Sequence, residues 1–349
     1  MHGQESHQPQ LITVTNLDDR VPPAHPIRRL KAVADEVITP LLPGLRALYS
    51  TRGRAGIPPE FLLRALVLQA VFSIASERQL VEALEYNLLF RWFVGLGLDG
   101  KAWDATTFAK NRQRLLESEA GKAFLSSTVQ VAEQKGLLSD HQFVVDGTLI
   151  KAYASLGRFR PKDENVPPSQ GNSKFKGEKR SNETHESKTD KDAKLMRKGP
   201  GAESMLAHLA SIVVHAASGL VQSARVGVIG EESEVDHALS MAEELPDGAI
   251  LAADKGYDSG KFRLGCRAVG VVGHPVPKSK NSSVDRRTTR HPSFDQSMKN
   301  RPKVEKAFAW MKANGRMRQT RFRGSGRVRL SFEMACASLN ILKMALLNA

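Results

Sequence analysis

The sequence predicts an α/β protein in which a mixed sheet flanked by helices follows an all-α N-terminal domain. Three observations support this fold class. Apolar residues recur at three- and four-residue spacing through residues 27–135, which is typical of helices. From residue 141 onward, short β-branched and aromatic runs alternate with helical segments. The chain has 349 residues, enough for one large or two ordinary domains with buried cores.

The composition is that of a soluble globular protein, with 41% hydrophobic and 25% charged residues. Uninterrupted apolar stretches fall short of the roughly 20 residues needed to span a bilayer, so no membrane partner is expected. The start, MHGQESHQPQ, lacks the basic residues and apolar run of a signal peptide, which favours the cytoplasm. Cys266 and Cys336 lie in apolar contexts without zinc spacing, so we expect buried small hydrophobic residues.

Positive charge is concentrated near the C-terminus. The formal net charge is +14, and residues 278–329 hold 16 Lys or Arg against three acids, a net of +13. A concentrated basic block favours a polyanionic partner, most simply nucleic acid. A solvated basic tail would lack apolar periodicity, whereas this block contains the amphipathic segment KVEKAFAWMK.

The helical part has recognisable starts. Residues 1–24 are polar and are expected to form a flexible leader, followed by a helical domain at residues 25–138. Pro58 and Pro59 mark the start of one helix, and Ser76 is a candidate N-cap for the next. The N-cap of a third helix is expected at Asp104 or Thr106.

The second half, residues 139–349, begins with the strand HQFVVDGTLI at residues 141–150. A polar segment follows at about residues 155–205. It contains few apolar residues and cannot bury a core, so we expect a long loop or insertion, partly disordered without a ligand.

The remaining elements alternate between strands and helices. A hairpin is expected around AASG at residues 216–219. Next come a helix at 231–245, a strand at 247–254, a helix at 259–268 and a strand at 269–276. A basic loop, residues 277–299, leads to a helix from about residue 301, and the last helix is expected at 331–347. This order matches a ribonuclease-H-like layer, a mixed sheet with helices on both faces.

Two acids are expected at strand ends. Asp146 in FVVD and Asp254 in ILAAD each follow an apolar strand run. Sites in open α/β sheets lie outside the carboxyl ends of the strands. One such acid is often only a helix cap, but two on strands predicted to be neighbours indicate a site.

Glu305 is a third candidate acid. At about 100° per residue, Arg301, Glu305 and Lys312 fall on one stripe of the helix RPKVEKAFAWMK. Taken alone, this stripe could be a surface ion-pair ladder. Three converging carboxylates would, however, suit Mg²⁺, and two such ions can activate the nucleophile and stabilise the leaving oxygen in phosphodiester cleavage.

Several separated motifs occur in a meaningful order. They are GIPPEFLLRALVLQAVFSIASERQLVEALEYNLLFRWFVGLGLDGKAWDATTFAKNRQRL, VVDGTLIKAYAS, LAADKGYDS, VDRRTTRH, RPKVEKAFAWMK and RFRG. Through them nearly the whole chain resembles the DDE transposases of bacterial insertion sequences, in the group with an InsH-like N-terminal region. The resemblance implies that Asp146, Asp254 and Glu305 are the catalytic acids and bind Mg²⁺, for which Mn²⁺ would substitute.

The resemblance also implies residues that hold DNA. Related transposases carry a signature of Tyr, Arg, Glu and Lys, which Arg301, Glu305 and Lys312 fit. The tyrosine position falls on Met298, and Lys306 stands where an acid is common, so the chain departs from the pattern at two places. Further candidates for DNA contact are Lys255, Tyr257, Arg287, Arg290, Arg321 and Arg323.

The implied function is metal-dependent cleavage at the ends of an insertion sequence, followed by strand transfer into target DNA. The partners would be the terminal inverted repeats and the target DNA, with a homodimer on DNA in the bacterial nucleoid. The helical domain would recognise the repeats, dimerise or do both. Two alternatives stay open: a catalytically inactive repressor derived from a transposase, and a related metal-dependent nuclease.

Overall fold

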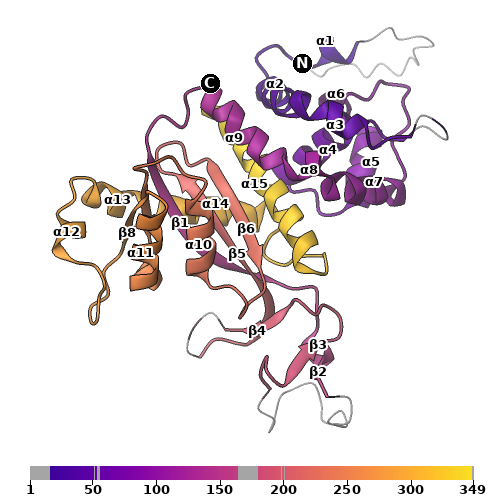
Figure 1. The fold of residues 1–349 in the computed structure, drawn as a ribbon. Helices are drawn as coiled ribbons and strands as arrows, with labels where there is room; N and C mark the ends of the chain where they lie inside the picture. Colours follow the sequence, from indigo (N-terminus) through magenta and orange to yellow (C-terminus); the bar gives the residue numbers. More distant parts are fainter. Residues whose placement is uncertain are drawn as a thin grey trace, which may run out of the picture.

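A computed structural model of the chain describes residues 16–50, 52, 56–163, 180–197, 199 and 201–347. The N-terminal part is built from helices (Figure 1). They are α1 (Leu17–Arg20), α2 (Pro26–Ile38), η1 (Thr39–Leu41), α3 (Leu42–Arg46), α4 (Pro59–Val71), α5 (Glu77–Tyr86), α6 (Leu88–Val94), α7 (Ala105–Glu117), α8 (Glu119–Lys122) and α9 (Phe124–Gln134).

Three expected helix starts are confirmed. Pro59 is the first residue of α4, where its missing N–H costs no helical hydrogen bond. The Ser76 side chain accepts a hydrogen bond from the Gln79 backbone N–H and caps α5. Asp104, rather than Thr106, caps α7.

The sheet has the predicted ribonuclease-H-like topology. Its strands are β1 (Gln142–Lys151), β4 (Lys194–Met196), β5 (Met205–His215), β6 (Val221–Gly227), β7 (Ile250–Ala253) and β8 (Val272–Pro275). The order is β6-β5-β1-β7-β8, with β4 pairing a separate length of β5. β5 runs antiparallel to β1 and β6, whereas β1, β7 and β8 are parallel. The mixed sheet is therefore confirmed, and so is the β5–β6 hairpin.

Helices cover both faces of this sheet (Figure 1). On one face lie α10 (Glu234–Ala242) and α11 (Gly260–Ala268), and on the other α14 (Lys303–Ala313) and α15 (Ser325–Leu347). α12 (Arg286–Thr289) and α13 (Phe294–Asn300) lie beyond β8 and α11. Successive strand residues face opposite sides, so Val145 packs with α10 and α11 while Val144 joins the larger core. Cys266 and Cys336 are buried free thiols, as expected.

α15 connects the two parts of the molecule. It begins at Ser325, earlier than the expected residue 331, and packs against β6, α9, α2 and α4. By length and composition alone α15 could cross a membrane, because its most apolar 18-residue stretch has a mean hydropathy of 1.4. However, 67% of that stretch is buried inside the molecule. Asn340 accepts from the Val221 N–H at 2.7 Å and donates to Thr128 Oγ1 at 2.9 Å. The helical part and the sheet therefore share one core through α15.

The described parts of the polar segment form more than the expected loop. β2 (Phe159–Pro161) and β3 (His185–Ser187) form a small antiparallel sheet, and β4 extends the main sheet. Residues 164–179, 198 and 200, on which the expectation of partial disorder falls, lie outside the described residues.

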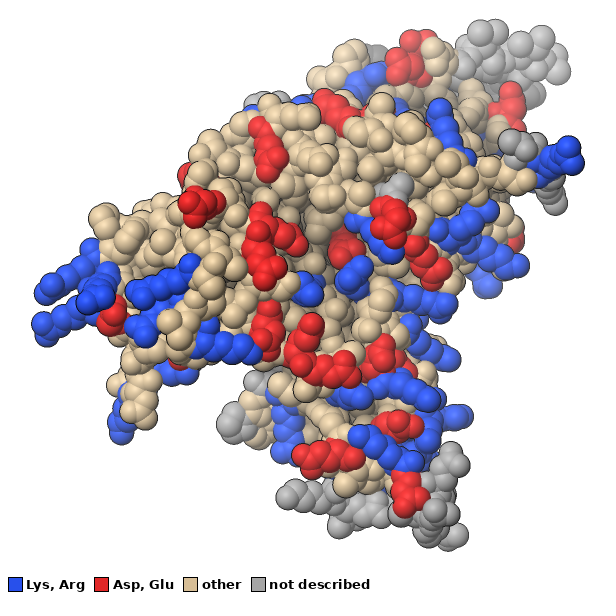
Figure 2. Space-filling model, viewed as in Figure 1, with Lys and Arg blue, Asp and Glu red and all other residues tan. Residues whose placement is uncertain are grey.

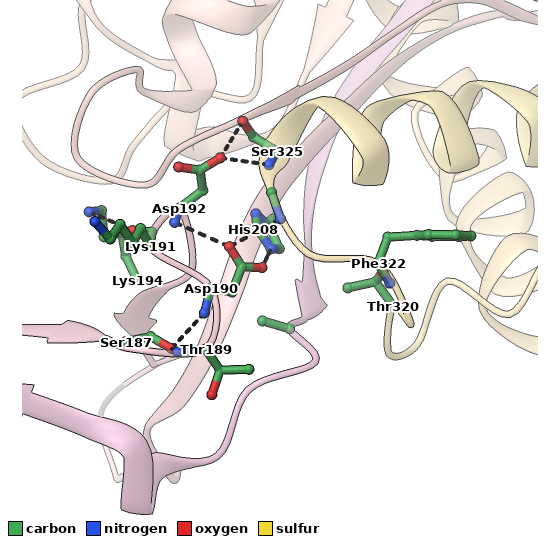
Figure 3. Close-up of polar contacts among 12 residues, drawn as sticks. Ser187, Thr189, Asp190, Lys191, Asp192, Lys194, His208, Thr320, Phe322 and Ser325 are labelled. Atoms are coloured by element: carbon green, nitrogen blue, oxygen red, sulfur yellow. Dashed lines mark hydrogen bonds and ion pairs between the residues drawn. The ribbon is translucent and has the colours of Figure 1, made fainter. Parts of the chain in front are cut away.

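Two carboxylates join the polar segment to the start of α15 (Figure 3). Asp192 Oδ2 accepts from the Ser325 N–H at 2.7 Å and from its hydroxyl at 2.9 Å. Asp190 accepts from the Gly324 N–H at 3.1 Å and lies 3.1 Å from His208 Nε2. Asp190 and His208 are both buried. The segment is thus docked onto the start of α15 and onto β5, and His208 is a core residue paired with an acid.

Candidate active site

Asp146 lies in the middle of β1, not at the strand end that the sequence predicted. β1 continues to Lys151 because its second half still pairs with β5, beginning with Gly147 opposite Ser211. The strand itself was expected at residues 141–150, so its extent is close to the prediction, and only the place of Asp146 at its end was wrong.

Asp254 directly follows Ala253, the last residue of β7, as predicted. β1 and β7 are adjacent and parallel, with Val144 opposite Ala252. Asp146 and Asp254 each stand two residues beyond this pair. Their side chains therefore belong to the same region at the carboxyl end of β7.

Arg301 joins the acids of two different elements. It lies between α13 and α14, since α14 begins at Lys303 and not at the expected residue 301. Its Nη2 is 3.2 Å from Asp254 Oδ2, and its Nη1 is 3.6 Å from Glu305 Oε1. The Arg301 guanidinium thus lies between a carboxylate at the end of β7 and one on α14.

The charges of Arg301, Asp254 and Glu305 all affect the carboxyl group of Asp146. Partial burial raises the pKa of its carboxyl, and the charges of Asp254 and Glu305 raise it further. The Gly147 N–H, which donates to Asp146 at 2.8 Å, and the Arg301 charge act in the opposite direction. The structure therefore brings the three predicted acids into one electrostatic field. Within the part of the chain that is described, however, no three His, Cys, Asp or Glu side chains are close enough to hold one ion.

Glu234 is a fourth acid at this place, which sequence reasoning missed. It is the first residue of α10, with Ser233 as the N-cap. A Cβ atom built on Gly147 would lie only 2.8 Å from the Glu234 carboxyl carbon. Partial burial raises the pKa of Glu234, and the charges of Asp146 and Asp254 add to this. The glycine after Asp146 was the one local signal that another side chain approaches there.

Tyr257 is not available to stack on DNA, which corrects the sequence prediction. It is 1% exposed, and its ring packs against Phe262 with centroids 5.5 Å apart. Its hydroxyl is buried and forms no hydrogen bond among the described residues. Burial raises its pKa far above the usual range, and the charges of Glu234, Asp146 and Asp254 contribute. The aromatic ring is core, and the hydroxyl lies close to the acids.

Asp258 fixes the basic loop to the turn that follows Asp254, another role that the sequence did not reveal. Its carboxylate accepts from the Lys278 N–H at 2.8 Å, the Ser282 hydroxyl at 2.6 Å and the Ser283 N–H at 2.8 Å. Asp258 is buried. The start of the basic loop is therefore held against the site.

The other predicted DNA contacts are spread over the surface. Lys255 is exposed beside Asp254, and Lys312 lies two turns beyond Glu305, with its ammonium 5.7 Å from the Phe308 ring. The four predicted arginines are exposed and fall into two pairs, Arg287 and Arg290 at α12 and its C-cap, and Arg321 and Arg323 before α15. Figure 1 places α12 and the start of α15 at opposite sides of the sheet. The four do not form one surface.

The charge on the face in Figure 2 is uneven. Lys and Arg gather over the end that carries α12 and again around the polar segment near β2 and β3, with Asp and Glu between them. A polyanion lying across this face would meet cations at both ends of an acidic centre.

Comparison with known proteins gives two family matches. A model described as "Transposase domain (DUF772)" matches residues 15–114, and one described as "Transposase DDE domain" matches residues 271–345. The second match contains Arg301 and Glu305 but neither aspartate. No curated protein matches the chain.

Two solved structures are similar to the chain at low levels. A piggyBac transposase synaptic complex with hairpin DNA has a TM-score of 0.42 and 10% identity, over 93% of this chain and 76% of that chain. A Mos1 transposase paired-end complex with the left transposon end has a TM-score of 0.19 and 9% identity, over 64% of this chain and 61% of that chain. The two family models together cover half of the chain, the first on the helical part and the second on the part that contains the sheet. The chain is a DNA transposase of the DDE family.

Proposed function

We propose that Asp146, Asp254 and Glu305 form the acidic centre at which this transposase cuts the ends of its element and joins them to target DNA. One observation carries the proposal. Asp146 lies on β1 and Asp254 directly follows the adjacent parallel strand β7, while Arg301 connects Asp254 to Glu305. These contacts support a site at the carboxyl end of β7, where α/β proteins place their sites.

The donor set fits a divalent cation. Carboxylate oxygens are the hard ligands that Mg²⁺ and Mn²⁺ prefer, and the acids already attract the Arg301 guanidinium. Asp146, Asp254 and Glu305 would hold the metal. When bound, Mg²⁺, or Mn²⁺ in its place, would make the attacking oxygen more nucleophilic and stabilise the leaving oxygen.

The residues of the chain would position DNA for two reactions. In the first, water attacks a phosphate at the element end, and the bond from phosphorus to the 3′ oxygen breaks. In the second, the freed 3′ hydroxyl attacks a target phosphodiester and displaces its 3′ oxygen. Arg301 would turn from the acids to a DNA phosphate, where its planar donors suit the oxygens. Lys312 and Lys255 would hold the backbone nearby.

Substitution of one acid tests this function. Purified protein is incubated with Mg²⁺ and a duplex carrying the inverted repeats that flank the gene. Asp254→Asn is expected to abolish cleavage and to retain DNA binding in a gel-shift assay. If the wild-type protein binds the ends but cuts in neither Mg²⁺ nor Mn²⁺, the chain is instead a DNA-binding repressor. Cutting of any duplex regardless of its ends would indicate a plain nuclease.

The division of labour along the chain is also a proposal. Residues 25–138, after a leader at 1–24, would recognise the inverted repeats and help to dimerise the protein, while residues 139–349 carry the chemistry. We further propose that the active assembly is a homodimer on DNA in the bacterial cytoplasm. The mass of the complex with end DNA, measured by light scattering, would decide between one copy and two.

A further inference from the structure

We propose that Glu234 is a fourth carboxylate of this active site and binds a divalent cation together with Asp146. This inference rests on the proposed function of Asp146 and extends it to a residue outside the three acids. Glu234 comes from α10, on the face of the sheet opposite α14, which carries Glu305. The acids would therefore approach the cation from two sides.

The first argument is the close approach of Glu234 to β1. A Cβ atom on residue 147 would lie 2.8 Å from the Glu234 carboxyl carbon and 2.9 Å from its Oε1. Glycine at this position leaves the space that the carboxylate occupies. Gly147 faces α10 and the preceding Asp146 faces the other side of the sheet, so the two carboxylates flank β1 from opposite faces beside the end of β7.

The second argument is that the turn carrying Glu234 is fixed. His237, on the same first turns of α10, contacts Ser211 Oγ on β5 through Nδ1 at 3.0 Å. Its Nε2 contacts Glu232 Oε2 at 3.0 Å. Ser211 is paired with Gly147 across the β1–β5 ladder. The buried histidine therefore sets the start of α10 over the residue beside Asp146, so the position of Glu234 is supported by the sheet.

The third argument is the Tyr257 hydroxyl. It is buried without a hydrogen-bond partner among the described residues, although it lies within the field of Glu234, Asp146 and Asp254. An unsatisfied buried hydroxyl is costly unless a further polar group completes the site. A hydrated cation held by these acids would supply such a group. Glu234 is only partly buried, and the exposed portion of its side chain lets solvent and ions reach it.

Cation binding, measured without any cleavage assay, tests the proposal. Mn²⁺ uptake by the full-length protein is measured by calorimetry, alone and on end DNA with the DNA background subtracted. Glu234→Gln is nearly isosteric and is expected to weaken Mn²⁺ binding at least tenfold. Glu231→Gln makes the same charge change on an exposed neighbour and is expected to leave affinity unchanged.

The outcomes separate this proposal from the proposed function. If Glu234→Gln binds Mn²⁺ like the wild type while Asp146→Asn loses it, Glu234 is not a ligand and the three-acid centre stands. If Asp146→Asn binds like the wild type, the proposed function itself fails. A wild-type protein that takes up no Mn²⁺ in either state would overturn both.

Gly147→Ala gives a second, steric test. The added methyl group would push the flexible Glu234 side chain away and is expected to weaken Mn²⁺ binding severalfold. In a Glu234→Ala background no carboxylate remains to be displaced, so the same glycine substitution should then have little further effect. Equal losses in both backgrounds would show that Gly147→Ala acts on Asp146, and would contradict the proposed place of Glu234.

Discussion

The Arg301 guanidinium lies 3.2 Å from the Asp254 carboxylate, at the point where the sheet ends. The same side chain reaches Glu305 on α14 at 3.6 Å. The Arg301 guanidinium thus neutralises two of the acids for which we propose a catalytic role. A divalent cation bound there would compete with Arg301 for the same oxygens, so the guanidinium would have to move.

This competition predicts that Arg301→Gln strengthens Mn²⁺ binding but slows DNA cleavage. Without the guanidinium, Asp254 and Glu305 lose a partly exposed counter-charge worth up to about 1 kcal/mol. Mn²⁺ binding is therefore expected to tighten up to about fivefold, while DNA cleavage falls about 100-fold because a phosphate donor is lost. Calorimetry and a cleavage assay measure the two effects, with the exposed Lys306→Gln as the control. Weaker Mn²⁺ binding in Arg301→Gln would refute the competition.

Asp258 is expected to hold the basic loop. Its burial favours the neutral acid, but hydrogen bonds from Ser282, Ser283 and the Lys278 N–H keep its pKa well below the usual range. Asp258→Asn removes charge-assisted acceptors and is expected to lower unfolding free energy by about 1–3 kcal/mol. Tryptic cleavage near Lys278 should become faster.

Asp285→Asn is the matched control, because Asp285 lies in the same loop but caps α12 by accepting a hydrogen bond from the Thr288 N–H. Urea unfolding and the rate of tryptic cleavage are the measurements. Unchanged proteolysis near Lys278 in Asp258→Asn would show that the loop is held by other contacts.

The raised pKa of the Glu333 carboxyl predicts that the stability of the protein changes near neutral pH. Burial on α15 raises the pKa of its carboxyl to about 7, despite Arg329 at 3.4 Å. The folded protein keeps a proton that the unfolded chain releases above its ordinary pKa of 4.5, so stability falls as pH rises from about 4.5 to about 7.

Glu333→Gln should remove this loss. We expect the variant to be more stable than the wild type by on the order of 2 kcal/mol at pH 8 and equal to it at pH 4. Thermal melts at the two pH values measure the effect, with the exposed Glu82→Gln as control. If the variant were more stable than the wild type by the same amount at pH 4, the stabilisation would come from packing and not from the titration of Glu333.

Asp190 and Asp192, which dock the polar segment, should contribute unequally to the free energy of unfolding. Asp190→Ala leaves buried His208 without its partner and is expected to cost about 2–3 kcal/mol of unfolding free energy. Asp192→Ala removes a cap at Ser325, which is worth about 1 kcal/mol. Urea unfolding of both variants measures the difference, and equal losses would contradict the importance of the buried pair.

DNA binding should depend steeply on salt. Each phosphate contact contributes about 0.9 to the slope of log affinity against log salt concentration. The double variant Arg287→Gln and Arg290→Gln removes two exposed cations of α12 and is expected to lower the slope by about 2. A slope that does not change, measured by fluorescence anisotropy between low and moderate salt, would place DNA away from α12.

Local patterns were sufficient for much of the fold. Pro59, Ser76 and Asp104 begin their helices where the sequence indicates, because caps and turn residues act on the adjacent backbone. The alternation of strands and helices predicted the mixed sheet, and the apolar run before Asp254 placed this acid at the end of β7. Each of these features depends on neighbours within a few residues.

Features that depend on distant partners could not be read in this way. β1 continues past Asp146 because β5 pairs with it, and Tyr257 is buried because Phe262 and the sheet enclose it. Glu234 looks like an ordinary residue at the start of a helix until Gly147 is found beneath it. The sequence by itself determined most of the main helices and strands and that an acid follows β7. Only the tertiary structure decided which side chains meet, because pairing and burial arise between segments that are remote along the chain.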